Sequence, residues 1–176
     1  MNMREWFLAG TAVIGLTAAS ASFATTVEKE EFKHLVQQAH ACVVAQTVGI
    51  EHVMENGAPV TKTTFTVTET AFGSTPETIT VTTPGGRIQG AKVPMGEVNA
   101  GIPQFLNGTS AVLLLEQQAN GDYVVSGVTQ GVFDLSQTAL GYVVRLPDSQ
   151  GGLVSLSEAL DVINDARDAE VNETAE

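Results

Sequence analysis

Histidine and cysteine side chains are the first place to look for chemistry in this chain, because both types bind transition metals. His40, Cys42 and His52 follow one alternation along a predicted strand. Ten strand residues span roughly 33 Å, so Cys42 and His52 are too far apart to share a zinc ion with ligand bonds of about 2 Å. His40 and Cys42 alone supply too few ligands for a zinc site. We therefore expect no metal site and no cofactor.

A cysteine can also act as a nucleophile, and Cys42 is the single cysteine of the chain. An intramolecular disulfide is therefore excluded, and the fold must depend on its apolar core. The residues around Cys42 carry no thiol-protease signature, and the chain has no Gly-x-Ser-x-Gly motif. We expect Cys42 to be a small buried core residue, with a reactive or intermolecular thiol as the alternative. We expect no catalytic residue and no enzyme activity.

Carboxylates are the remaining groups that could act as acids or bases. Glu69 interrupts the apolar alternation of its strand. It is either a buried general acid or a strand-end carboxylate that reaches solvent or a backbone amide, and we favour the second interpretation. Asp161, Asp165 and Asp168 have helical spacing, which is typical of a solvated helix face, and they lack the spacing of a calcium loop.

A long segment from Gly85 to Asn107 contains five glycines and two prolines. We expect it to be mostly loop, with one short irregular strand around residues 87–93. Loops this long are uncommon in compact domains, and binding residues often lie on them. No helix with a lysine and a hydroxyl residue follows Pro84-Gly85-Gly86, so a tight turn is favoured over a phosphate cradle. The candidate binding residues of this segment are Arg87, Gln89, Lys92 and Met95.

Charge and composition limit the possible partners. Eight basic residues minus 20 acidic residues give a net charge of -12. Such a surface repels phosphate backbones and anionic lipids, so we expect no nucleic-acid partner. With 176 residues, 43% of them apolar, the chain is large enough for one domain with its own core.

The N-terminus has the pattern of a secretory signal peptide. Arg4 precedes an uncharged stretch from Trp6 to Ala19, which is too short to cross a bilayer as a helix. Ser22 and Ala24 are small residues at suitable recognition positions, so the sequence predicts a signal peptide over residues 1–24, with a retained anchor as the alternative. We expect an exported protein, periplasmic or extracellular, with no membrane insertion after cleavage.

Periodicity predicts the elements that position these residues. A helix is expected to precede the first strand and to end near His40. Strands are expected over residues 41–54, 61–72, 78–83, 110–116, 123–133 and 140–146, with Gly127 and Gly131 interrupting the fifth. In the first strand, Val48 and Met54 are expected on the buried face, with Gln46 and His52 as polar exceptions. The continuous run Val112-Leu113-Leu114-Leu115 predicts a strand covered on both sides, and Asn120-Gly121-Asp122 predicts the turn that follows it. Ser155 and Glu158 form a capping box for a C-terminal helix that is expected to fray beyond Arg167. The domain boundaries predicted are 25–170 for a single β-rich domain and 171–176 for an acidic tail.

These elements predict a mainly β fold, a small closed or partly open barrel of five or six strands, of OB or netrin-like type, with an N-terminal and a C-terminal helix. An immunoglobulin-like sandwich is the alternative, because short strands with glycine-bearing turns suit either architecture. The barrel is preferred because Gly49 lies in the middle of a long first strand, where a bend would let that strand close a barrel.

The order of short runs along the chain is similar to that of a family of bacterial exported proteins of unassigned activity. The layout also resembles the netrin-like barrel of the tissue inhibitors of metalloproteinases. Those inhibitors dock through a disulfide-held N-terminal cysteine, which this chain lacks, so neither inhibition nor any functional residue is carried over. The runs are Leu35-Val36, Ala41-Cys42-Val43-Val44, Thr64-Phe65-Thr66-Val67-Thr68-Glu69, Thr80-Val81-Thr82-Thr83-Pro84-Gly85-Gly86, Pro103-Gln104-Phe105, Val112-Leu113-Leu114-Leu115, Tyr123-Val124-Val125 and Gln130-Gly131-Val132-Phe133.

The function predicted from these observations is a non-catalytic exported binding module whose partner is another exported protein. Two alternatives remain open at this point. The first is a subunit of an extracellular assembly, in which the Thr-rich strand from Thr61 to Phe72 offers an edge to a neighbour. The second is a hydrolase or metal-dependent enzyme without a recognisable motif.

Overall fold

A computed structural model describes residues 31–88, 95–97, 101–147 and 152–173. The mainly β fold is confirmed, with one helix before the first strand and one at the C-terminal end. The predicted signal peptide lies outside the described residues. In chain order the elements are α1 (Phe32–Gln38), β1 (Ala41–Glu55), β2 (Ala58–Phe72), β3 (Thr78–Pro84), β4 (Gly86–Ile88), β5 (Met95–Glu97), β6 (Ser110–Gln117), β7 (Tyr123–Val125), β8 (Val132–Thr138), β9 (Gly141–Val144), β10 (Val154–Ser155) and α2 (Leu156–Glu173).

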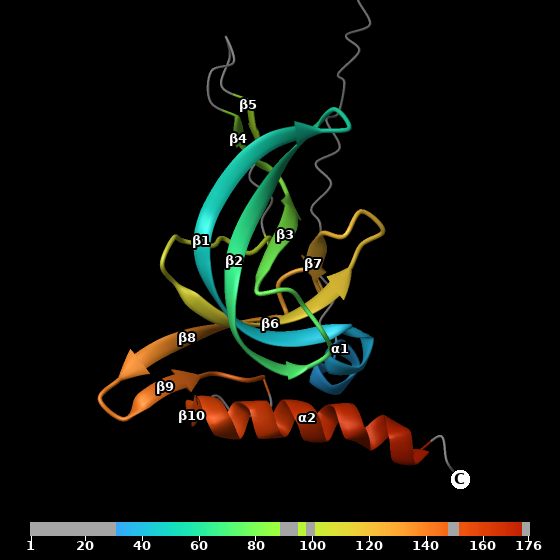
Figure 1. The fold of residues 1–176 in the computed structure, drawn as a ribbon, viewed down its shortest axis with the longest axis vertical. Helices are drawn as coiled ribbons and strands as arrows, with labels where there is room; N and C mark the ends of the chain where they lie inside the picture. The colour runs from blue at the N-terminus through green and yellow to red at the C-terminus, as the bar shows by residue number, and fades with distance from the viewer. Residues whose placement is uncertain (1–30, 89–94, 98–100, 148–151, 174–176) are drawn as a thin grey trace, which may run out of the picture.

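Eight of the strands form one sheet in the order β1-β2-β3-β7-β6-β8-β9-β10, and β1 also pairs with β6. This extra pairing closes a ring through β1, β2, β3, β7 and β6. The ring is completed by the parallel contact of β3 with β7, where Val81 lies opposite Tyr123. β4 and β5 form a separate two-stranded sheet at the end of the molecule opposite α2 (Figure 1).

Strand β1 pairs with two neighbouring strands, β2 and β6, because it is long and has an irregular register. Its first part pairs with β6 and its whole length pairs with β2, with register shifts that include one between Thr47 and Gly49. A shift of this kind bends the strand and increases its twist. The bend predicted at Gly49 is therefore confirmed.

The pairing of β1 with β6 divides the interior into two cores. Alternate residues of a strand point to opposite faces, and in this part of the sheet both faces are buried. The prediction that Val112-Leu113-Leu114-Leu115 is covered on both sides is confirmed, since all four side chains are fully buried. The core inside the ring contains Val43, Ala45, Phe65, Ile79, Val81, Ala111, Leu113, Leu115, Tyr123 and Val125.

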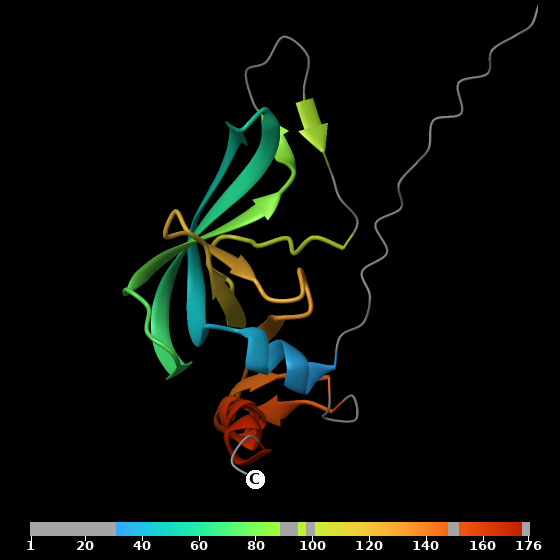
Figure 2. The same ribbon diagram turned by 90° about the vertical axis from the view of Figure 1, so that its right-hand side faces the viewer.

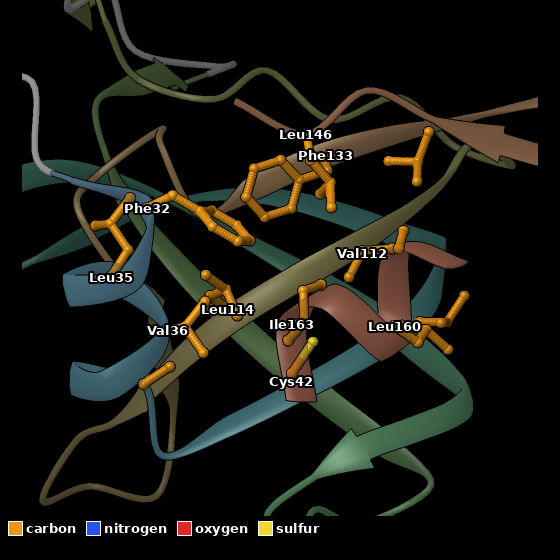
Figure 3. Packing of buried hydrophobic residues seen from close by; sticks show 14 residues of the cluster. Phe32, Leu35, Val36, Cys42, Val112, Leu114, Phe133, Leu146, Leu160 and Ile163 are labelled. Carbon is orange, nitrogen blue, oxygen red and sulfur yellow. The ribbon is translucent and has the colours of Figure 1, made fainter. Parts of the chain in front are cut away.

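The second core lies between the outer face of the sheet and the two helices, which cover the end of the molecule opposite β4 and β5 (Figure 2). Cys42, Val112 and Leu114 come from β1 and β6 and lie among side chains of α1 and α2 (Figure 3). Phe32 of α1 packs edge-on against Phe133 of β8, with ring centroids 5.9 Å apart. The helical periodicity predicted for both helices therefore corresponds to their buried faces.

Arg167 of α2 fixes the two helices to each other. Its guanidinium donates hydrogen bonds to the carbonyl oxygens of Val36, Gln37 and Ala39 at 2.8 to 3.3 Å. These carbonyls lie at the C-terminal end of α1, where a cation is favoured by the helix dipole and by unpaired acceptors. The guanidinium also lies 5.0 Å from the ring centre of Phe72.

Three details of the predicted strands are wrong. Val48 and Met54 were placed on a buried face but are about half exposed, because the register shifts of β1 break its simple alternation. The interrupted strand predicted over residues 123–133 is two separate strands, β7 and β8, and the break includes Gly127 and Val128, which both have positive φ angles. The predicted strand over residues 140–146 is shorter, as β9 covers Gly141–Val144.

At the C-terminal end, the predicted cap is present, and helix α2 extends beyond Arg167. The backbone N–H of Glu158 donates to Ser155 Oγ at 3.2 Å, which confirms Ser155 as a capping residue of α2. The helix continues past Arg167 to Glu173, so it includes the first three residues of the predicted acidic tail. Arg167 therefore lies inside α2, where its hydrogen bonds hold this part of the helix against α1.

The Thr-rich strand β2 is central in the sheet over much of its length. It pairs with β1 throughout and with β3 from Val60 to Thr66. The Val67 N–H also donates to the Glu77 carbonyl at 2.8 Å, so among the described residues the edge predicted for Thr61 to Phe72 is open only beyond Val67.

Gly73 follows β2 and lies very close to the backbone of His40 and Ala41 at the start of β1, and this close approach can be tested. Gly73 and Gly57 both have φ +82°, but a Cβ at Gly73 would lie 2.7 Å from Ala41 Cα and would also meet the His40 carbonyl, whereas a Cβ at Gly57 would meet nothing within 4 Å. We expect Gly73→Ala to lower the free energy of unfolding by about 1 to 3 kcal/mol more than Gly57→Ala, because only the first adds a backbone clash to the same φ strain. Urea unfolding of both variants measures the difference. Equal losses would contradict the close approach.

Cys42 is fully buried, and burial raises the pKa of its thiol to about 12. Because the thiolate is the reactive form, we expect iodoacetamide near pH 8 to leave the folded protein unlabelled and to label the unfolded protein readily. Mass spectrometry with and without guanidinium chloride measures the labelling, and Cys42→Ser is the control for reaction elsewhere. Similar labelling rates in the two conditions would show that Cys42 is accessible.

Candidate functional site

The structure places two of the four predicted binding residues on a short hairpin. Arg87 is exposed on β4 and lies opposite Gly96 of β5, while Met95 of β5 lies opposite Ile88. Gln89 and Lys92 lie outside the described residues. The segment predicted to be mostly loop therefore contains a paired two-stranded sheet, named here the β4–β5 hairpin.

The base of the β4–β5 hairpin is held by hydrogen bonds to β1 and β2. The Gly85 N–H donates to the Pro59 carbonyl at 2.8 Å, and the Thr61 hydroxyl donates to the Gly85 carbonyl at 2.8 Å. His52 Nδ1 lies 2.9 Å from the same Thr61 oxygen. Both backbone polar groups of Gly85 are thus paired, and the hairpin leaves the sheet in a defined direction.

This chain of contacts also fixes the proton on His52. A hydroxyl carries a single hydrogen, and that of Thr61 is donated to Gly85. Thr61 Oγ1 must therefore accept from His52, which requires a proton on Nδ1 of the imidazole. His52 acts here as a donor that orients Thr61, and Thr61 in turn orients the backbone at the start of β4.

A glycine is required at the first residue of β4. Gly86 has φ +144°, and a Cβ there would lie 2.7 Å from Thr61 Oγ1 and 2.8 Å from His52 Nδ1. Side chains rarely adopt this φ, so both the backbone conformation and the space favour glycine. The prediction of a tight turn at Pro84-Gly85-Gly86 is consistent with this geometry, because Gly85 also has a positive φ of 88°.

A second polar cluster lies on the outer face of β2 and β3. The Lys62 ammonium lies 3.1 Å from Asp122 Oδ2 and 3.6 Å from Glu55 Oε2, and the Thr82 hydroxyl donates to Asp122 at 3.3 Å. The hydrogen bond that Lys62 donates to Asp122 raises the pKa of the lysine above its ordinary value. These contacts fix the turn between β6 and β7 against β2. Both charged side chains are partly exposed, so the cluster positions this turn more than it stabilises the fold.

Sequence reasoning identified one partner of each cluster and missed the other. The sequence shows His52 as a polar residue in an apolar alternation, but nothing in it indicates Thr61 as the partner of His52. Asn120-Gly121-Asp122 was predicted to form a turn, whereas the contact of Asp122 with Lys62 joins residues far apart in the chain. A periodicity argument uses local spacing, so it does not detect pairs of this kind.

The other sequence candidates are solvated or isolated. Glu69, Asp161, Asp165 and Asp168 are exposed, which confirms the interpretation of Glu69 as a strand carboxylate that reaches solvent. Within the described ranges, no three His, Cys, Asp or Glu side chains come together in a way that could hold a metal ion. The same ranges contain no helix that is both long and apolar enough to cross a membrane.

The hydrogen bond from Thr61 gives a test of how the β4–β5 hairpin is held. Thr61→Val keeps the shape of the side chain and removes the hydroxyl, so the Gly85 carbonyl and His52 lose their partner. We expect a loss of about 0.5 to 1.5 kcal/mol in unfolding free energy and faster amide exchange at Arg87. Thr66→Val, an exposed change on the same strand, is the control and should alter neither quantity. Unchanged exchange at Arg87 in Thr61→Val would show that Thr61 does not hold the hairpin.

Comparison with known proteins adds nothing to this geometry. No family model matches the chain, no curated protein matches its sequence and no solved structure matches its fold. We therefore argue the role of the β4–β5 hairpin from its own residues.

Proposed function

We propose that this protein is an exported, non-catalytic binding module that presents the β4–β5 hairpin to another exported protein. The observation that supports this proposal is the anchoring of the hairpin through Gly85, Thr61 and His52. A binding element held at its base loses less conformational entropy on association than an unattached loop. The predicted signal peptide over residues 1–24 is the basis for the proposed export.

The β4–β5 hairpin offers a partner two kinds of contact, the backbone N–H and C=O groups at its strand edges and the positive charge of Arg87. Within the described residues, β4 and β5 pair only with each other, so each has an edge on which an extended segment could add as a further strand. Arg87 is exposed on β4 in a chain with a net charge of -12. We expect the partner to place a carboxylate against Arg87, because an acidic group would otherwise be repelled by most of this surface.

We also propose that the five-strand ring is a small barrel of OB or netrin-like type. Support comes from its closure through the β1–β6 pairing, from the long bent first strand shared across that closure, and from the parallel contact of β3 with β7. An immunoglobulin-like sandwich is less favoured, since its two sheets stay separate. In barrels of the OB type, loops at the ends of the strands commonly bind ligands, which agrees with a role for the hairpin.

The proposed function is tested by removing the hairpin without disturbing its anchor. Residues 87–96 are replaced by Asn-Gly, a two-residue turn that joins antiparallel strands. Purified wild-type and variant proteins are used to capture proteins from the exported fraction of the source cells. We expect a protein that wild type retains and the variant loses, and we expect Arg87→Glu to weaken its retention.

Two controls make the result interpretable. Leu140→Ser changes a fully exposed residue of the β8–β9 hairpin and should retain the partner. Circular dichroism establishes that each variant is folded. Equal capture by the hairpin-deleted variant would contradict the proposed function, and concentration-dependent self-association lost on deletion would replace the partner by a second copy of this chain.

A further inference from the structure

A cavity of about 290 Å³ lies at the end of the molecule opposite the β4–β5 hairpin. It is lined by Val44 and Gln46 of β1, Thr68 and Glu69 of β2, and Tyr142 of β9, together with Ser110 of β6. Leu135 and Leu156 complete the wall. None of these residues contributes to the anchoring of the hairpin, so the cavity is a separate candidate site.

The cavity exists because α2 covers only part of the sheet. The buried residues Val112 and Leu114 lie under the helices, and α2 begins at Leu156, on the wall of the cavity. One step further along the same face, Gln46 of β1 lies directly opposite Ser110 of β6. The apolar face of the sheet thus changes to a polar one near Leu156, where α2 begins.

The polar groups of the cavity are mainly hydrogen-bond acceptors. The Thr68 hydroxyl donates its single hydrogen to the Val44 carbonyl at 3.1 Å, so its oxygen can only accept from a ligand. Gln46 Nε2 donates one of its two hydrogens to the Gly108 carbonyl at 3.2 Å, which orients the amide, with Oε1 as an acceptor and the second hydrogen as a donor. An ionised Glu69 carboxylate accepts only.

This set of groups selects the chemistry of a ligand. The acceptors on Thr68, Gln46 and Glu69 favour a ligand with several donors, and the Glu69 charge disfavours an anion. The hydroxyl groups of Ser110 and Tyr142 can both donate and accept. Val44, Leu135 and Leu156 provide an apolar surface, and the Tyr142 side chain is 46% exposed, so its ring is accessible. A ligand with many hydroxyl groups and one face of C–H groups matches both halves of this wall.

We propose that the cavity binds a single pyranose ring, either a free sugar or the end unit of a glycan. The ring stacks its C–H face on Tyr142 and donates hydroxyl hydrogens to Glu69 and Gln46. The volume of about 290 Å³ lies just below the range of about 300 to 1,000 Å³ for pockets that hold drug-sized ligands, which favours a ligand as small as one sugar ring. A longer saccharide would extend out of the cavity past the exposed side chain of Glu69.

The proposal is tested with methyl glycosides of glucose, galactose, mannose and N-acetylglucosamine, titrated into the full chain. Backbone amide shifts and saturation-transfer difference spectra report binding. We expect at least one glycoside to bind with a Kd in the millimolar range, with shifts at residues 46, 69 and 142. A glycan carrying the same terminal unit distinguishes the two sources, since tighter binding than the methyl glycoside favours a glycan end.

Variants separate the roles of the side chains. We expect Tyr142→Ala and Glu69→Gln each to raise Kd about tenfold, and Tyr142→Phe to raise it less because the ring is kept. Leu140→Ala, a fully exposed change on the same β8–β9 hairpin, is the matched control and should leave Kd unchanged. Both Glu69 and Tyr142 are exposed enough for these variants to fold, which amide spectra check.

Three outcomes would overturn the proposal. The first is an absence of shifts with every glycoside at about 50 mM, a concentration well above a millimolar Kd. The second is binding that Tyr142→Ala and Glu69→Gln leave unchanged, and the third is binding of tetramethylammonium in place of any sugar. Because the hairpin lies at the other end of the molecule (Figure 1), capture of a protein partner is measured independently of this result.

Discussion

The pairing of β1 with β6 is the constraint on which the rest of the structure depends. From Ala41 to Gln46, each residue of β1 lies opposite a residue of β6, and alternate side chains enter the core of the ring or the core under the helices. A shift of one residue would exchange the two faces of both strands. From Ala41 to Ala45 and from Ala111 to Leu115 every one of these side chains is apolar, because an unpaired polar group in either core would cost free energy. The ring, both helices and the direction of β1 all follow from this register.

Both candidate sites begin where that pairing ends. Past Gln46, β1 leaves β6, changes register with β2 between Thr47 and Gly49, and continues to the end of the molecule that carries the β4–β5 hairpin. On the outer face, the same point is where Gln46 and Ser110 replace apolar residues and α2 no longer covers the sheet. The end of the β1–β6 pairing at Gln46 thus separates two parts of β1. The part before it lines the cavity, and the part after it extends toward the β4–β5 hairpin.

Local patterns were sufficient for features that depend on neighbouring residues. The apolar run Val112-Leu113-Leu114-Leu115, the bend at Gly49 and the Ser155 cap were all predicted, because burial on both faces, a glycine in a strand and a capping residue each leave a mark within a few residues. Pairing between strands that are distant in the chain produces no local sequence pattern of this kind. The extra β1–β6 pairing and the contact of Lys62 with Asp122 required the structure, and Val128 adopts a φ of 65° that its branched side chain does not favour.

The polar residues that interrupt the apolar alternation of β1 mark where loops are attached. Gln46 donates to the Gly108 carbonyl, and His52 orients Thr61, which donates to the Gly85 carbonyl. In each case a side chain on a strand pairs a backbone oxygen from a separate segment, and a glycine supplies that oxygen. A loop held this way keeps its position without needing a core of its own, because the strand is already fixed by β-sheet hydrogen bonds. Gln46 then carries two roles, since the amide that holds residue 108 also lines the cavity. The loop at Gly108 and the cavity therefore share one side chain, and its orientation in the cavity is set by the hydrogen bond to that loop.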